Sequence, residues 1–263
     1  MTKRIKLWKE KELEDYFMEY YPANNRTSKA AAIIFPGGGY ELYGDYEGKD
    51  YAEMFNNCGM DAFVVFYRIK EKCIFPNSLN DARRAVRLVR RNADKYGIDT
   101  DKIIVVGSSA GGHLISQLCT NFDVLEKEGE DSLDSIDFLP NYQVLCYPVI
   151  DLTSQNSVTR KNYVGEDADD ETAKKHSANY HVKENTPPAF IWHTFEDAGV
   201  PINQSMCYVE ALKEKKINTE YHLFPFGNHG LGMADRDWRK NDHVAQWTGY
   251  LKKWLELYGL IRE

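Results

Sequence analysis

The chain has 263 residues, of which 43% are hydrophobic and 28% are charged, which excludes a disordered or fibrous protein. With 33 basic and 40 acidic residues its formal net charge is −7. An acidic chain of this kind lacks the positive field that attracts nucleic acid or an anionic membrane surface, so we expect neither as a partner.

Short apolar runs alternate with amphipathic segments along most of the chain. Several runs are apolar without alternation, which is typical of strands covered on both faces. We predict strands at 31–35, 62–67, 102–107, 143–150, 189–193 and 219–224. This alternation of strands and helices predicts an α/β fold, with a doubly wound, mostly parallel sheet and helices on both faces.

The clearest helical segment covers residues 79–93, where apolar residues recur at steps of three and four. Its opposite face carries five arginines: Arg83, Arg84, Arg87, Arg90 and Arg91. We expect this face to be exposed to solvent. Ser78, followed by Asp81, predicts the cap that begins this helix. A last helix is predicted over 242–258, ending at Gly259.

Two polar stretches interrupt the pattern, an acidic insertion near 123–140 and a longer one near 153–187. No linker of domain length separates them from the rest, so we expect a single domain over residues 1–263. Open α/β sheets carry their sites at the carboxyl ends of the strands. We therefore expect both insertions to lie over the active site.

The sequence also indicates the compartment. No stretch is long and apolar enough to cross a bilayer, and the charged start MTKRIKLWKE lacks the apolar core of a signal peptide. The five cysteines are odd in number, and no two form a C-x-x-C pair, which favours reduced thiols. We expect a cytoplasmic protein.

The segment Gly107-Ser108-Ser109-Ala110-Gly111 directly follows a predicted strand and opens an apolar segment. G-x-S-x-G between a strand and a helix is typical of a nucleophilic serine, because small neighbours allow a tight turn that exposes the hydroxyl. The new helix also points its free N–H groups at a developing oxyanion. His113 and Leu114 stand where a phosphate-binding loop has Lys and Ser or Thr, which disfavours that alternative.

A serine nucleophile needs a base, and the chain has seven histidines. In this architecture the chain order is serine, then acid, then histidine. His229 lies in a glycine-bounded loop directly after the last predicted strand, and it is our candidate. The others lie in predicted strands, helices or the second insertion: His113, His176, His181, His193, His222 and His243.

The acid is expected on a loop between the serine and the histidine. Asp197, in the segment FEDAGVP after the strand at 189–193, is our candidate. Its neighbour Glu196 and Asp151, at the end of the preceding strand, remain alternatives. The acid would hold the imidazole in the right tautomer and stabilise the imidazolium.

The segment Pro36-Gly37-Gly38-Gly39-Tyr40 directly follows the first predicted strand. Without side chains, such a loop lets backbone N–H groups approach a substrate oxygen closely. Its place two elements before the serine is that of an oxyanion-hole loop. A dinucleotide-binding fingerprint is excluded because Leu42 stands where its last glycine would be.

Together these motifs resemble the α/β-hydrolase superfamily, and within it the small esterases related to hormone-sensitive lipase. The resemblance spans about residues 28–258 and looks closest to the acetylxylan-esterase-like, or xylanase-B-like, branch. It implies that Ser109 is the nucleophile, His229 the base and Asp197 the orienting acid. The oxyanion hole that it implies consists of the N–H groups of Gly38, Gly39 and Ala110.

The resemblance implies a serine carboxylesterase that hydrolyses short-chain esters, most simply acetyl esters and possibly those of acetylated xylo-oligosaccharides, without a metal or cofactor. A small amidase or peptidase of the same fold and a non-catalytic binding protein are the alternatives, and a homo-oligomer is compatible with the sequence. Pro36 replaces a histidine of the lipase motif, so the glycine loop must be braced from elsewhere. Only about 29 residues precede the first predicted strand, and no large cap domain is expected.

Overall fold

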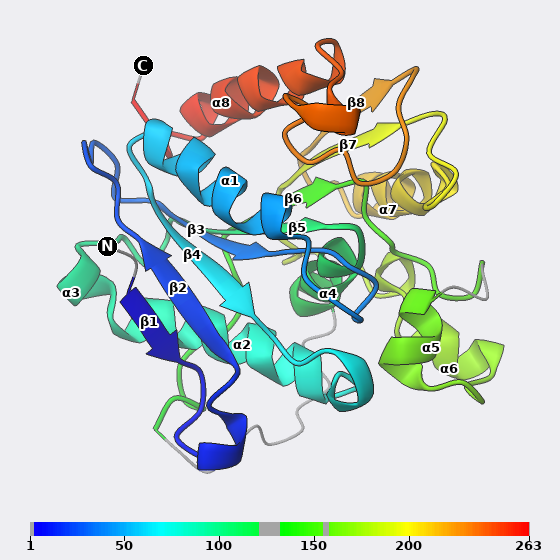
Figure 1. Cartoon of the computed structure of the whole chain (residues 1–263), viewed down its shortest axis with the longest axis horizontal. Coiled ribbons are helices and arrows are strands. Elements are labelled where there is room, and N and C mark those ends of the chain that lie inside the picture. The colour runs from blue at the N-terminus through cyan, green and yellow to red at the C-terminus, as the bar shows by residue number, and fades with distance from the viewer. Residues whose placement is uncertain (1–2, 121–131, 155–157, 263) are drawn as a thin grey trace.

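The computed structural model describes residues 3–120, 132–154 and 158–262. Within these residues eight strands form one sheet in the order β1-β2-β4-β3-β5-β6-β7-β8 (Figure 1). The β2 strand pairs antiparallel with β1 and β4, and all the other neighbours are parallel. The strands are β1 (Lys3–Lys6), β2 (Phe17–Tyr21), β3 (Ala31–Phe35), β4 (Asp61–Phe66), β5 (Ile103–Ser108), β6 (Tyr142–Cys146), β7 (Ala189–Thr194) and β8 (Thr219–Phe224). The predicted mostly parallel α/β sheet is confirmed.

Helices cover both faces of this sheet (Figure 1). One face carries α1 (Asp45–Asn57) and α8 (Trp247–Leu257), and the other carries α2 (Asn77–Arg91), α4 (Ser109–Thr120) and α7 (Asn203–Glu214). Successive residues of a strand point to opposite faces of the sheet, so Ile33 packs in the apolar cluster on one face and Ile34 in the cluster on the other. Because both faces are buried there, the inner strands β3 to β7 are mostly apolar.

The remaining helical elements are short. They are the α-helices α3 (Ala93–Tyr96), α5 (Val158–Val164) and α6 (Asp170–Lys175), and 3-10 turns at Lys11–Leu13, Lys70–Lys72, Ala178–Tyr180, Asp237–Arg239 and Val244–Gln246. The predicted last helix thus begins with a 3-10 turn and continues as α8. Gly259 follows it with φ of 63°, the left-handed conformation that ends helices.

The arginine face of α2 is largely buried, and the prediction that solvent covers it is wrong. Arg83, Arg84 and Arg87 are only 1%, 3% and 6% exposed. The Arg84 guanidinium donates to the Leu7 carbonyl and lies over the Trp8 ring, 4.4 Å from its centroid. The N-terminal segment, with strands β1 and β2 that the sequence analysis did not predict, therefore covers part of this helix.

The predicted cap of α2 is also wrong, because its two side chains have distant partners. Helix α2 begins at Asn77, and the Ser78 hydroxyl donates to the carbonyls of Arg68 and Cys73 at 2.8 and 2.9 Å. The Asp81 carboxylate accepts hydrogen bonds from the Arg68 guanidinium. Both residues thus fasten the helix to the segment after β4.

The described part of the first insertion lies at the amino ends of the strands, and not at their carboxyl ends as predicted. Helix α4 returns the chain to the amino ends of the strands before this insertion begins. Its described part, 132–140, stays there: the next residue, Asn141, donates to the carbonyl of Ile103 at the start of β5. Residues 123–131 lie outside the described part of the chain. The predicted strand at 143–150 is too long, because β6 ends at Cys146 and Tyr147 has φ of 38°.

Candidate active site

Ser109 occupies the turn between β5 and α4, with a positive φ of 51° that few residues other than glycine adopt. The turn brings backbone segments very close together. A Cβ at Gly107 would lie 2.4 Å from the Gly111 oxygen, and a Cβ at Gly111 would lie 2.0 Å from the Phe35 oxygen. Only glycine fits at either position, which is the physical reason for the G-x-S-x-G spacing.

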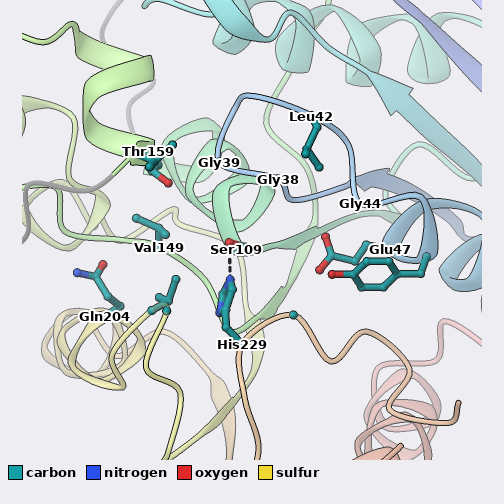
Figure 2. A pocket seen from close by; sticks show the side chains of 15 residues that line it. Gly38, Gly39, Leu42, Gly44, Glu47, Ser109, Val149, Thr159, Gln204 and His229 are labelled. Atoms are coloured by element: carbon teal, nitrogen blue, oxygen red, sulfur yellow. Dashed lines mark hydrogen bonds between the residues drawn. The ribbon is translucent and has the colours of Figure 1, made fainter. Parts of the chain in front are cut away.

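The structure brings Ser109, His229 and Asp197 into one hydrogen-bonded chain at the carboxyl ends of the strands. His229 Nε2 lies 2.8 Å from Ser109 Oγ, the contact dashed in Figure 2, and its Nδ1 lies 2.7 Å from Asp197 Oδ2. A carboxylate can only accept, so Nδ1 carries the imidazole proton and Nε2 accepts from the serine hydroxyl. In this arrangement the imidazole can take the serine proton.

The Asp197 side chain is fully buried beneath the imidazole. Its Oδ1 accepts hydrogen bonds from the N–H groups of Gly199 and Val200, at 2.9 and 2.8 Å. Burial by itself raises the pKa of this carboxyl, but the neighbouring His193 and His229 outweigh burial and hold the pKa well below its usual range. The carboxylate is therefore ionised at neutral pH and can stabilise an imidazolium.

The two alternative acids lie elsewhere. Glu196 is exposed to solvent. The Asp151 carboxylate accepts from the Thr153 hydroxyl at 2.7 Å and lies 3.3 Å from that of Ser177. Among the described carboxylates, Asp197 is the one hydrogen-bonded to His229.

The glycine loop lies against the serine turn. Gly38 and Gly39 line the same pocket as Ser109, with φ of 128° and 66°. None of the described residues accepts a hydrogen bond from their N–H groups. Ala110 is the second residue of α4, in the first turn, where N–H groups have no acceptor within the helix. These three N–H groups are therefore available as donors near the serine.

Glu47 and Tyr147 complete the site, and the sequence analysis missed both. Glu47 Oε2 accepts from the N–H of Gly37 at 2.6 Å, and its Oε1 accepts from the Tyr147 hydroxyl at 2.6 Å. Glu47 thus supplies the brace that the lipase motif takes from its histidine. An acidic residue in the first turn of a helix is usually an exposed cap, so the local pattern gave no sign of its burial.

A cavity of about 570 Å³ opens over Ser109 (Figure 2). Its wall is part apolar and part polar, and includes Leu42, Val149, Val158, Val200, Tyr46, Glu47, Thr159 and Gln204. Val158 and Thr159 belong to α5, so the second insertion contributes to the pocket. Asn162, also on α5, donates to the Gly39 carbonyl at 2.8 Å and ties this helix to the glycine loop.

Across the described ranges, no three His, Cys, Asp or Glu side chains gather where they could hold a metal ion. No helix in this part of the chain combines the length and apolar composition needed to cross a membrane.

A mostly parallel sheet with a serine on a strand–helix turn, an acid after β7 and a histidine after β8 defines an α/β hydrolase. The model of the BD-FAE family matches residues 18–212, and the chain belongs to this family. The crystal structure of an acetyl ester-xyloside bifunctional hydrolase from Caldicellulosiruptor lactoaceticus is similar, with a TM-score of 0.89 and 35% identity. That alignment covers 99% of this chain and 97% of the other.

Two curated relatives agree with this assignment. The chain is 35% identical to endo-1,4-beta-xylanase B of Butyrivibrio fibrisolvens over 94% of its length, and 28% identical to an acetylxylan esterase of Xylanibacter ruminicola over 90%. It spans only 40% and 47% of those two proteins. The resemblance to the small esterases related to hormone-sensitive lipase is confirmed.

Proposed function

We propose that the chain is a serine carboxylesterase that hydrolyses acetyl and other short-chain esters through an acyl-enzyme. The observation that carries the proposal is the 2.8 Å contact between Ser109 Oγ and His229 Nε2, made beside unpartnered glycine N–H groups in the pocket. A nucleophile, a base with the correct tautomer and oxyanion donors are the groups that acyl transfer requires.

The reaction begins when His229 Nε2 takes the Ser109 proton while Oγ attacks the ester carbonyl. Negative charge then develops on the carbonyl oxygen, where the N–H groups of Gly38, Gly39 and Ala110 stabilise it. One such donor contributes roughly 10²–10³ to the rate in a measured enzyme. Asp197 stabilises the imidazolium meanwhile.

The tetrahedral intermediate collapses when His229 returns its proton to the leaving alcohol, which leaves the acyl group on Ser109. Water enters next, and His229 removes a proton from it as it attacks the acyl carbonyl. The acid is released when Ser109 recovers its proton. Each step moves one proton through one imidazole nitrogen and requires no cofactor.

Acetylated sugars, such as acetylated xylo-oligosaccharides, are the proposed substrates. One observation that supports this class of substrate is that the relatives named above include an acetylxylan esterase and an acetyl ester-xyloside hydrolase. The pocket wall also mixes aliphatic side chains with polar ones, which suits a small acyl group attached to a polyhydroxy alcohol.

The test compares esters with amides on the purified chain. We expect hydrolysis of 4-nitrophenyl acetate, declining activity as the acyl chain grows to octanoyl, and release of acetate from acetylated xylo-oligosaccharides. Ser109→Ala should abolish turnover while the thermal midpoint stays within a few degrees of wild type. Preference for an aminoacyl 4-nitroanilide would indicate an amidase or peptidase instead, and no turnover of any ester would contradict the proposal.

A further inference from the structure

Glu47 is a buried carboxyl at the active site. The residue is only 2% exposed and lines the pocket that contains Ser109. In the described part of the chain, no Lys, Arg or His side chain forms an ion pair with it. Burying such a group costs free energy unless hydrogen bonds compensate, and an apolar residue would serve packing better. The position therefore points to a role beyond holding α1 on the sheet.

One oxygen of this carboxyl helps to fix Gly37, the residue that precedes the two oxyanion glycines. The Gly37 N–H donates to Glu47 Oε2 at 2.6 Å, and the Gly37 carbonyl accepts from the Gly44 N–H at 2.9 Å. A Cβ on Gly37 would lie 2.7 Å from Glu47 Oε2 and 2.9 Å from the Ser109 Cβ. Gly37 is thus held between the carboxyl and the serine turn.

The other oxygen connects to the histidine loop through Tyr147. The Tyr147 hydroxyl donates to Glu47 Oε1 at 2.6 Å and accepts from the N–H of Gly232 at 2.9 Å. Gly232 lies three residues after His229 in the same loop. The Tyr147 ring also packs edge-on against the imidazole, with centroids 5.1 Å apart and an interplanar angle of 75°.

These contacts form one bridge, Gly37–Glu47–Tyr147–Gly232, between the two loops that act on the substrate carbonyl. In Figure 2 the Glu47 side chain lies beside the glycine loop, on the far side of Ser109 from Val149 and Gln204. The bridge therefore stands apart from the α5 side of the pocket.

We propose that Glu47 and Tyr147 are positioning residues that set the separation between the oxyanion-binding N–H groups and the His229 imidazole. This assignment rests on the proposed esterase function. Charge develops on the oxyanion and the imidazolium together in the transition state, so a loosened bridge weakens transition-state binding more than ground-state binding. Its loss should appear mainly in kcat.

Two substitutions break the bridge at different atoms. Glu47→Gln offers one acceptor where two are needed, because the amide nitrogen can only donate. Tyr147→Phe removes the hydroxyl but keeps the ring against His229. Glu53→Gln is the matched control, since Glu53 is an exposed carboxylate on the same helix, paired with Lys49 at 3.6 Å.

Each variant is assayed with 4-nitrophenyl acetate, and its active sites are counted with a fluorescent fluorophosphonate. We expect both bridge variants to lower kcat per active site by about 10- to 100-fold, while KM changes less than about threefold. The inhibition constant of an alkyl trifluoromethyl ketone, which forms a tetrahedral oxyanion on the serine, should rise by the same factor as kcat/KM falls. The kcat of the double variant should be only slightly below that of the less active single variant, because both substitutions break the same bridge. The kcat of Glu53→Gln should match that of wild type.

The outcomes separate this assignment from the proposed function. A wild-type chain that neither hydrolyses the ester nor reacts with the fluorophosphonate would overturn the esterase proposal, and the assignment with it. If wild type is active, unchanged kcat per active site in both variants would overturn the assignment alone, as would a fall in kcat/KM without a matching change for the ketone. Should Glu47→Gln not fold, the same comparisons on Tyr147→Phe decide.

Discussion

Replacing Asp197 with asparagine changes one oxygen to nitrogen at the buried end of the hydrogen-bonded chain. Asp197 Oδ1 accepts from two backbone N–H groups, those of Gly199 and Val200, so the asparagine oxygen will occupy that place. The opposite amide orientation would lose both bonds, each worth about 1 kcal/mol, and leave donors facing donors. The amide NH₂ therefore faces His229 Nδ1.

This orientation determines the size of the expected effect. Nδ1 must now accept, so the imidazole proton moves to Nε2, which can no longer accept from Ser109. In a serine protease the equivalent exchange of tautomer lowers kcat by about 10⁴. At about 1.36 kcal/mol for each factor of ten, the transition state loses about 5.5 kcal/mol. We expect a loss of this order here.

The assay measures kcat for 4-nitrophenyl acetate at pH 7.5 on Asp197→Asn and on Glu196→Gln, its exposed neighbour. Glu196→Gln should stay within about twofold of wild type, since it contacts neither the imidazole nor the serine. A loss below tenfold in Asp197→Asn, or a greater loss in the control, would refute the assignment of the orienting acid.

Two further predictions concern stability. Arg84→Ala removes the contacts with Leu7 and Trp8 and should lower the free energy of unfolding by about 1–3 kcal/mol, measured by urea titration, without changing kcat. Arg91 is exposed, so Arg91→Ala should lower the free energy of unfolding by less than about 0.5 kcal/mol. Equal effects of the two substitutions would contradict the burial argument. Burial lowers the pKa of His113 to about 4 in the folded protein. As the pH falls, the His113 imidazole is therefore protonated in the unfolded chain before it is protonated in the folded one. The free energy of unfolding of wild type should therefore fall as the pH drops from about 6.5 to about 4, by up to about 1.4 kcal/mol per pH unit from this group. In His113→Gln the free energy of unfolding should depend less steeply on pH. An equal slope in the two proteins would contradict this prediction.

The features that the sequence predicted are those determined locally or by chain order. Strands β3 to β7 are mostly apolar because helices cover both faces of the sheet there. The Ser109 turn can be predicted from the sequence because its close backbone contacts admit only glycine at positions 107 and 111. Asp197 and His229 follow from topology, since parallel strands place the loops after β7 and β8 at one edge of the sheet.

The features that it did not predict depend on partners distant in the chain. The arginines of α2 look like a solvated face until the N-terminal strands cover them, and β1, with sequence KRIK, has no apolar run to reveal it. Glu47 looks like an ordinary acid in a first helical turn until Tyr147, 100 residues later, meets it. Local periodicity contains no information about such pairings.

The central claim is that Ser109 is a nucleophile activated by His229. The most direct measurement is peptide mass spectrometry after treatment of the chain with a fluorophosphonate. We predict a single phosphonyl adduct at Ser109, with Ser108 and Ser116 in the same tryptic peptide unmodified, and labelling at least about 10³-fold slower in His229→Ala. An adduct at another serine, or equal labelling in His229→Ala, would contradict the account.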